Sequence, residues 1–302
     1  MTSAELLEGA DRCGRIPYLS RSWQRNTLTP MGALYRSIEA GLESPDPDPG
    51  QCAGDTLMGL AVDRGLETPQ SDLFGLAQHL AAIADMVTWI LRPSDPWERP
   101  ENVKVGSAVW ESSVFLSASG TRLRRILLVD HWNEARELAE SHSWRSMGEC
   151  AAYQMPMDQT VIVLGANRAG RRHGAFSKAW THPVSKQIRF RKRDGSGFDG
   201  NWTPIYREDW EGSREGWLDA MTGDGVLEDA ICQVEVSIPN QSEEIRRLAS
   251  NRLEGLSTQA TLPAPHLSQC DNPLGPCQFR SSCWTFQPPS EQLGFVRLSS
   301  IG

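Results

Sequence analysis

Several features are missing from this 302-residue sequence. No apolar run reaches the ~18 residues that a helix needs to span a bilayer. The first residues lack the basic start and apolar core of a signal peptide. The phosphate-binding pattern GxxxxGK[ST] is absent and no GxGxxG follows an expected strand, which argues against an NTPase or a dinucleotide enzyme. We therefore expect a cytoplasmic protein without membrane contact.

Acidic residues are missing from one long window. The net charge is −8, which argues against indiscriminate binding of nucleic acid but leaves room for a local basic face. Residues 159–193 contain no Asp or Glu and nine of the thirty Lys and Arg. These nine are Arg168, Arg171, Arg172, Lys178, Lys186, Arg189, Arg191, Lys192 and Arg193.

With its glycines and the neighbouring Phe176, Trp180 and Phe190, this basic stretch has the composition of a surface that binds phosphates and stacks on bases. The alternative is a solvated loop whose charges pair with the acidic residues of 207–215.

The hydrophobic pattern changes along the chain from helical spacing to strand-like runs. Helices are expected over 1–42 and 56–92 with a loop at 44–55, then strands over 103–117 and 122–132, a helix over 133–153 and a strand over 159–166. A helix over 206–221, a strand over 229–239 and a helix over 242–256 capped by Ser242 follow. The order strand, strand, helix, strand predicts an α/β core flanked by helices.

This order divides the chain into three parts. Residues 1–55 form an N-terminal helical segment, residues 56–260 form the α/β core with the basic stretch, and residues 261–302 form a Cys-rich tail. The tail is rich in Pro, Ser and Cys, and it cannot bury a core of its own. We therefore expect it to be fixed by something other than apolar packing.

Four of the seven cysteines offer such a fixing point. Cys270, Cys277 and Cys283 lie close together in the tail, and Cys13 can supply a fourth ligand from the other end of the chain. Thiolates converging in irregular backbone are typical ligands of a soft metal centre. We predict one metal site, a [4Fe–4S] cluster, that joins the two ends.

Two alternatives remain for these cysteines. A zinc ion could be held by Cys270, Cys277, Cys283 and His266 without Cys13. The four cysteines could also be unrelated buried thiols, which is the expectation for Cys52, Cys150 and Cys232.

The segments DRCGRIPYL, around Cys13, and PCQFRSSCW, around Cys277 and Cys283, resemble the iron–sulfur RecB-like nucleases, which include the CRISPR-adaptation exonuclease. The resemblance covers both ends well and the middle in outline. In that family the first tail spacing is commonly Cys-x2-Cys, whereas this chain has Cys-x6-Cys. The resemblance implies a PD-(D/E)xK-like central mixed sheet flanked by helices, with the N- and C-terminal segments joined at the cluster.

The resemblance also implies a partner and a setting. The partner would be DNA, single-stranded or at ends, bound within a larger protein or ribonucleoprotein complex of defence, recombination or mobile elements. Nucleases of this kind bind Mg2+ or Mn2+ through a strand Asp and a Glu/Asp-x-Lys motif, with a His in an early helix and Gln-x3-Tyr in a later one.

Carried onto this chain, the catalytic positions fall on Glu111, Asp130, Glu149 and Tyr153. Several of the family's residues are replaced. Tyr35 lies near the position of the His, Ser112 and Ser113 lie where the strand Asp is expected, and Trp132 takes the place of the Lys. The resemblance therefore implies a degenerate site in a protein that binds DNA.

Two other functions stay open. Glu111 and Asp130, with His131 or Glu134, could form a changed metal site of a divergent DNA exonuclease. The chain could instead be a structural subunit that uses the basic stretch to bind an acidic protein or a guide RNA.

Overall fold

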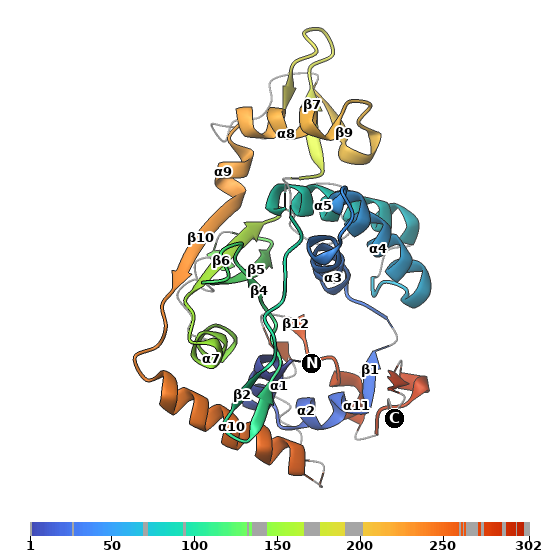
Figure 1. Cartoon of the computed structure of the whole chain (residues 1–302). Helices are drawn as coiled ribbons and strands as arrows, with labels where there is room; N and C mark the ends of the chain where they lie inside the picture. Colours follow the sequence, from blue (N-terminus) through green and yellow to red (C-terminus); the bar gives the residue numbers. More distant parts are fainter. Residues whose placement is uncertain are drawn as a thin grey trace.

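The computed structural model describes most of the chain. The described residues are 2–25, 27–68, 72–92, 95–131, 133–134, 144–165, 176–190, 202–259, 261, 263, 271–272, 275–285, 288–293 and 295–298. They form a mixed α/β protein in which small sheets, one of them mixed, are flanked by helices (Figure 1). The sequence-based prediction of fold class is confirmed at this level.

The elements run the length of the chain. The helices are α1 (Ser3–Arg12), α2 (Arg15–Ser20), α3 (Pro30–Glu43), α4 (Pro49–Arg64), α5 (Leu73–Leu91), α7 (Trp144–Tyr153), η1 (Arg207–Asp209), α8 (Arg214–Gly223), α9 (Val226–Ala230), α10 (Ser242–Thr258), α11 (Arg280–Thr285) and η3 (Glu291–Leu293). The strands are β1 (Trp23–Arg25), β2 (Val103–Val105), β3 (Ala108–Trp110), β4 (Phe115–Leu116), β5 (Leu123–Val129), β6 (Met157–Val163), β7 (Lys178–Thr181), β8 (Ile188–Arg189), β9 (Thr203–Tyr206), β10 (Ile231–Val236), β11 (Asp271–Asn272), β12 (Gly275–Pro276) and β13 (Phe295–Arg297).

The central sheet has the strand order β10-β6-β5-β4. Strands β5 and β6 are parallel and are joined through α7, whereas β4 and β10 pair antiparallel at the two edges. One face carries Ile126 and Ile162 and packs on α3, α4 and α5 in the largest buried cluster. The other face carries Leu123 and Met157 and packs with Cys150 of α7. Helices therefore cover both faces of this sheet.

The helical layer differs from expectation at α4. This helix begins at Pro49, inside the segment 44–55 that was expected to be a loop, and it runs through the domain boundary expected at residue 55. The Asp48 side chain accepts a hydrogen bond from the amide of Gln51, and proline is well suited to the first helical turn. The Pro/Asp-rich composition here marks the start of a helix.

Helix α5 has an unusually apolar sequence. It is 19 residues long and, by length and composition alone, apolar enough to cross a membrane. Half of its most apolar stretch is buried, since it packs on α3 and α4 and contributes Leu80, Ile83 and Val87 to the core. Packing in the core accounts for its apolar sequence.

The strand expected over 103–117 is divided into three. Strands β2 and β3 form a hairpin that turns at Gly106 and Ser107, and Gly106 has a φ of +63°, which glycine adopts without strain. This hairpin packs with α1, α7 and α10 in a separate cluster around Trp110. The expected cap of α10 was also displaced by one residue, because its N-cap is Gln241 and not Ser242.

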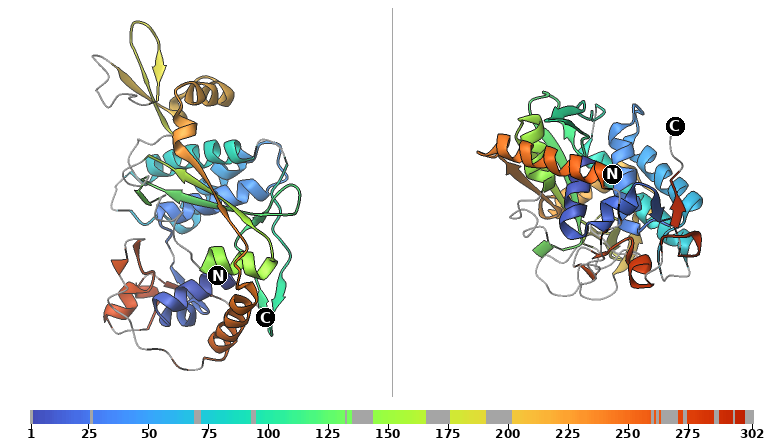
Figure 2. Two further views of the ribbon diagram at one scale, coloured as in Figure 1. Left: turned by 90° about the vertical axis from the view of Figure 1, so that its left-hand side faces the viewer. Right: turned by 90° about the horizontal axis from the view of Figure 1, so that it is seen from below.

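A second sheet, ordered β8-β7-β9, projects from the body beside α8 (Figures 1 and 2). Its inner side is held by Phe190, which packs edge-to-face on Trp217 of α8 with ring centroids 4.9 Å apart. We call this three-stranded sheet the arm. The arm and its turns contain the described basic residues of the basic stretch, Lys178, Lys186 and Arg189.

The two ends of the chain lie side by side. Strand β1 pairs antiparallel with β13, with Trp23 opposite Arg297 and Arg25 opposite Phe295. Figure 1 shows the C-terminal segments, in red, next to α1, α2 and β1, in blue. The chain's first and last elements therefore form one unit below the helical layer.

Candidate functional site

Cysteines from both ends share one buried cluster. Cys13 follows α1 directly, Cys277 precedes α11 and Cys283 lies within it. Their exposed fractions are 8%, 8% and 2%, and all three belong to the cluster that contains Phe279 and Phe295. Those two rings stack with centroids 5.5 Å apart. Three of the four cysteines expected to be metal ligands thus belong to one buried apolar cluster.

The chemistry of this cluster suits a metal centre in part. Cys13 and Cys283 are free thiols, and the guanidinium of Arg15 donates to the Cys283 sulfur over 3.8 Å. Cys270 and the alternative zinc ligand His266 lie outside the described residues. Within the described residues, no group of three or more His, Cys, Asp or Glu has the arrangement of a metal site. The thiols suit a soft metal by type and by burial, but the described thiols are not arranged as a metal site.

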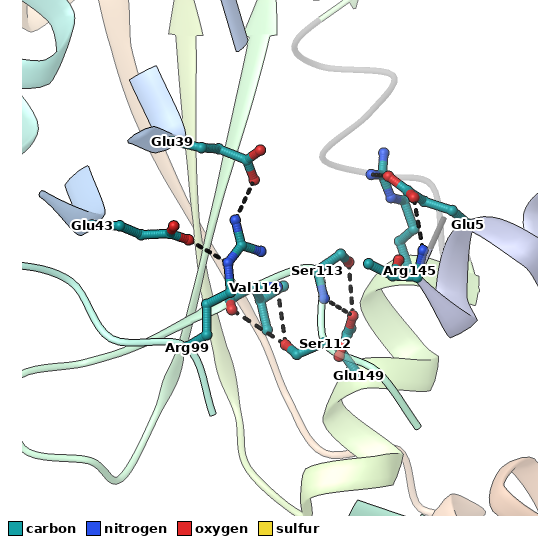
Figure 3. A network of polar contacts seen from close by, with 10 residues as sticks. Glu5, Glu39, Glu43, Arg99, Ser112, Ser113, Val114, Arg145 and Glu149 are labelled. Carbon is teal, nitrogen blue, oxygen red and sulfur yellow. Dashed lines mark hydrogen bonds and ion pairs between the residues drawn. The ribbon is translucent and has the colours of Figure 1, made fainter. Parts of the chain in front are cut away.

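Glu149 lies at the centre of a second, polar cluster between α7 and the strands (Figure 3). It is fully buried. The indole Nε1 of Trp110 donates to one carboxylate oxygen over 3.0 Å, and the amide and hydroxyl of Ser113 donate to the other over 2.9 and 2.7 Å. Burial raises the pKa of Glu149, and these hydrogen bonds oppose the rise only in part.

Two arginines flank Glu149, and sequence analysis missed both. Arg125 of β5 is 8% exposed and donates to Ser146 over 3.0 Å and to Gln159 over 3.4 Å. Burial lowers the pKa of Arg125 to about 10. Among the described residues it makes no ion pair with a carboxylate. The period-two pattern of β5, which puts residue 125 on the face of Leu123, was the signal for its burial.

Arg145 of α7 is the second arginine near Glu149. It pairs with Glu5 over 2.8 Å and with Glu8 over 3.6 Å, and so it ties α7 to α1. Tyr35, the residue near the family's His position, lies within the electrostatic range of both arginines, and its pKa is raised to about 12, chiefly by burial. Tyr35 and Glu149 thus lie in the electrostatic field of the buried Arg125 and the half-buried Arg145.

The other expected catalytic residues lie apart from this cluster or at its edge. Glu111 is exposed, and its backbone pairs with Ser3. Burial raises the pKa of Tyr153 to about 12. Asp130 follows β5, and its pKa is raised by burial and by the neighbouring Glu134. The amide of Asp130 donates to the Glu134 carboxylate over 3.2 Å, whereas Trp132 lies outside the described residues.

The arm presents cations and aromatic rings on one face. Lys178 and Trp180 lie two residues apart on β7, so their side chains are on the same face. Arg189 is directly opposite Trp180, and Tyr206 is directly opposite Lys178. Residues directly opposite in an antiparallel pair share a face. Lys178 Nζ lies 4.2 Å from the centroid of the Trp180 ring.

Trp202 extends this face, although sequence analysis did not single it out. The guanidinium of Arg189 lies 5.6 Å from the centroid of the Trp202 ring, and the ring of His182 packs edge-to-face on it at 5.3 Å. Lys186 is exposed in the β7–β8 turn. The remaining six basic residues, Arg168, Arg171, Arg172, Arg191, Lys192 and Arg193, lie outside the described residues.

Comparison with known proteins adds no relative. No family model matches the chain, and neither curated proteins nor solved structures give a match.

Proposed function

We propose that this chain is a DNA-binding iron–sulfur protein of the RecB-like, PD-(D/E)xK type whose nuclease site no longer cleaves. The single observation that carries the proposal is the shared burial of Cys13, Cys277 and Cys283. An apolar cluster that small, built from the two ends of the chain, gains much of its folding energy if a metal joins its thiolates.

In this proposal the four ligands are Cys13, Cys270, Cys277 and Cys283. When bound, a [4Fe–4S] cluster supplies four metal–thiolate links that hold the ends together. Arg15 beside Cys283 offsets part of the negative charge of such a centre. Zinc bound by the three tail cysteines and His266 is the alternative, and it leaves Cys13 without a ligand role.

The topology of the central sheet supports a nuclease-like ancestry. An antiparallel pair, β4 and β5, leads through α7 to the parallel β6, which is the element order expected from the resemblance. Glu149 and Tyr153 lie on α7, where the resemblance places Gln and Tyr.

The contents of the site support loss of cleavage. A site for Mg2+ or Mn2+ needs carboxylates that are ionised and turned toward open space. The carboxylate of Glu149 instead accepts three hydrogen bonds from within the protein. Burial also raises its pKa and so opposes its ionisation. The neighbouring buried guanidinium of Arg125 would repel a divalent cation.

The arm supports DNA binding. Its outward face combines Lys178, Arg189 and the rings of Trp180 and Trp202, and such a face can contact phosphates while bases stack on the rings. Mixing the purified protein with labelled single-stranded DNA tests this function. The proposal expects a salt-dependent shift without degradation, and an absence of any shift would contradict it.

A divergent exonuclease remains the second candidate because Asp130 and Glu134 lie together. Burial, and then the nearby charge of Glu134, raises the pKa of Asp130, and perturbed carboxylates of this kind occur at functional sites. Mn2+-dependent degradation of DNA that is lost in Asp130→Ala would favour this candidate.

A further inference from the structure

A cavity of about 470 Å³ opens where the two ends of the chain meet the helical layer. It is bounded by the end of β1, the start of α3, the end of α4 and Cys277. Three arginines line it, Arg25, Arg36 and Arg64, against one carboxylate, that of Glu67.

The charges on the wall of this cavity do not balance. Glu67 pairs with Arg25 over 3.0 Å. Among the described residues, neither Arg36 nor Arg64 makes an ion pair with a carboxylate. Arg64 donates instead to the backbone carbonyl of Arg25. Burial, and then the nearby charge of Arg36, lowers the pKa of Arg64. Two guanidinium groups are therefore held near each other with their repulsion unrelieved.

We infer that Arg25, Arg36 and Arg64 form a binding site for a phosphate monoester group. Three guanidinium groups and one carboxylate leave two positive charges, which match a phosphate carrying ≈ −1.5 to −2 charges. Guanidinium groups bind phosphate oxygens in pairs with good geometry, so arginine suits this ligand better than lysine. The inference does not rest on the proposed function, since no metal and no residue of the arm takes part.

The phosphate can come from the end of a nucleic-acid strand or from a small phosphate in solution. Both present the same group, and two probes distinguish them. Inorganic phosphate is titrated by calorimetry. Single strands that differ only in a terminal phosphate or a terminal hydroxyl are then compared by fluorescence anisotropy.

The variants are Arg36→Gln and Arg64→Gln, with Arg247→Gln as the matched control. Arg36 is exposed, so Arg36→Gln should fold normally. Arg64→Gln removes a hydrogen bond to the Arg25 carbonyl, and Arg36→Gln therefore tests the site even if Arg64→Gln is unstable. Arg247 is exposed on α10, far along the chain from the cavity, and its substitution changes the charge by the same amount. Iron and zinc are assayed on every sample.

The expected result is that wild-type protein and Arg247→Gln bind inorganic phosphate, while Arg36→Gln weakens binding at least about tenfold, or about 1.4 kcal/mol. A preference for the phosphorylated strand that disappears in Arg36→Gln would identify the strand end as the source. Equal affinities for the two strands would identify a small phosphate. Unchanged phosphate binding in both variants, or no binding by the wild-type protein, would overturn the inference. Loss of bound metal in Arg36→Gln would overturn it as well, because the arginines would then balance the charge of a metal centre.

Discussion

The guanidinium of Arg15 donates to the sulfur of Cys283 over 3.8 Å, although 268 positions separate the two residues. The same guanidinium donates through Nε to the carbonyl of Pro263 over 2.7 Å. The start of the chain therefore holds the tail by polar contacts as well as by the apolar cluster around Cys13. These contacts connect the start of the chain with the C-terminal tail, two segments that the sequence analysis had linked only through their cysteines.

Gly148 tests the packing that fixes Glu149. A Cβ at this position of α7 would lie 2.7 Å from Cη2 of the buried Trp110 ring. We expect Gly148→Ala to lower the free energy of unfolding by about 1–3 kcal/mol, because the ring has no free space to move into. Urea denaturation measures the change.

Gly59→Ala on α4 is the control, because a Cβ there meets nothing within 4 Å. It should raise stability by up to ~1 kcal/mol through helix propensity. A Gly148→Ala protein as stable as Gly59→Ala would show that Trp110 does not pack on α7 as described.

Glu149 gives a pH dependence of defined sign. Because burial raises its pKa in the folded protein, the stability that it contributes is present at low pH and is lost as the pH rises through the folded pKa. Glu149→Gln cannot ionise. Its free energy of unfolding should therefore improve relative to wild type as the pH rises from about 4 to about 8.

Urea denaturation at several pH values measures this difference. Glu228→Gln, at an exposed position of α9, should show no such trend. A wild-type advantage that grows with pH would mean that Glu149 is ionised and stabilising in the folded protein.

Removing the two tryptophans on the arm tests base stacking. We expect Trp180→Ala and Trp202→Ala each to weaken binding of single-stranded DNA by about 1–3 kcal/mol, the usual contribution of one stacked base. Trp284→Ala is the matched control, since Trp284 is 53% exposed on α11 and lies outside the arm. Equal affinities in all three variants, measured by fluorescence anisotropy, would remove the arm from the proposed binding surface.

Asp130→Ala separates loss of cleavage from a divergent nuclease. We expect neither wild type nor the variant to degrade labelled DNA with Mn2+, because Glu149 is occupied by internal hydrogen bonds and Arg125 would repel a cation. Asp63→Ala, at an exposed position of α4, is the control. Degradation by wild type and Asp63→Ala that stops in Asp130→Ala would replace the account with the exonuclease.

Sequence patterns found the central strands and most of the helices, and missed β1, the strands of the arm and the contacts between elements. The apolar runs of β5 and β6 were identified because each buries side chains on both faces of the sheet. The strand expected over 103–117 was wrong in extent, since the turn at Gly106 interrupts an otherwise β-like composition. The start of α4, from Pro49 to residue 55, was missed because proline at a first helical turn and proline in a loop are alike in sequence.

Of the cysteine cluster, the site of Arg125 and the arginine-lined cavity, only the first was expected from the sequence. A tail without a core of its own led to the expectation that its cysteines meet Cys13, and Cys13, Cys277 and Cys283 share one buried cluster. Their role as metal ligands stays a prediction. The buried Arg125 was not expected, because a cation in the run RLRR is ordinarily solvated and only the register of β5 turns this one inward. The cavity lined by Arg36 and Arg64 lies between residues of two helices, α3 and α4, and no local sequence pattern predicts that these residues are close.

The most direct test of the account is the metal content of protein purified without oxygen, with absorbance, iron, sulfide and zinc measured on one sample. The account predicts a brown protein with a broad visible shoulder and about four irons and four sulfides per chain. It also predicts that Cys277→Ser is colourless and poorly soluble while Cys52→Ser is unchanged, since Cys52 lies on α4 outside the cysteine cluster. A colourless wild-type protein that holds one zinc, or no metal, would contradict the central claim.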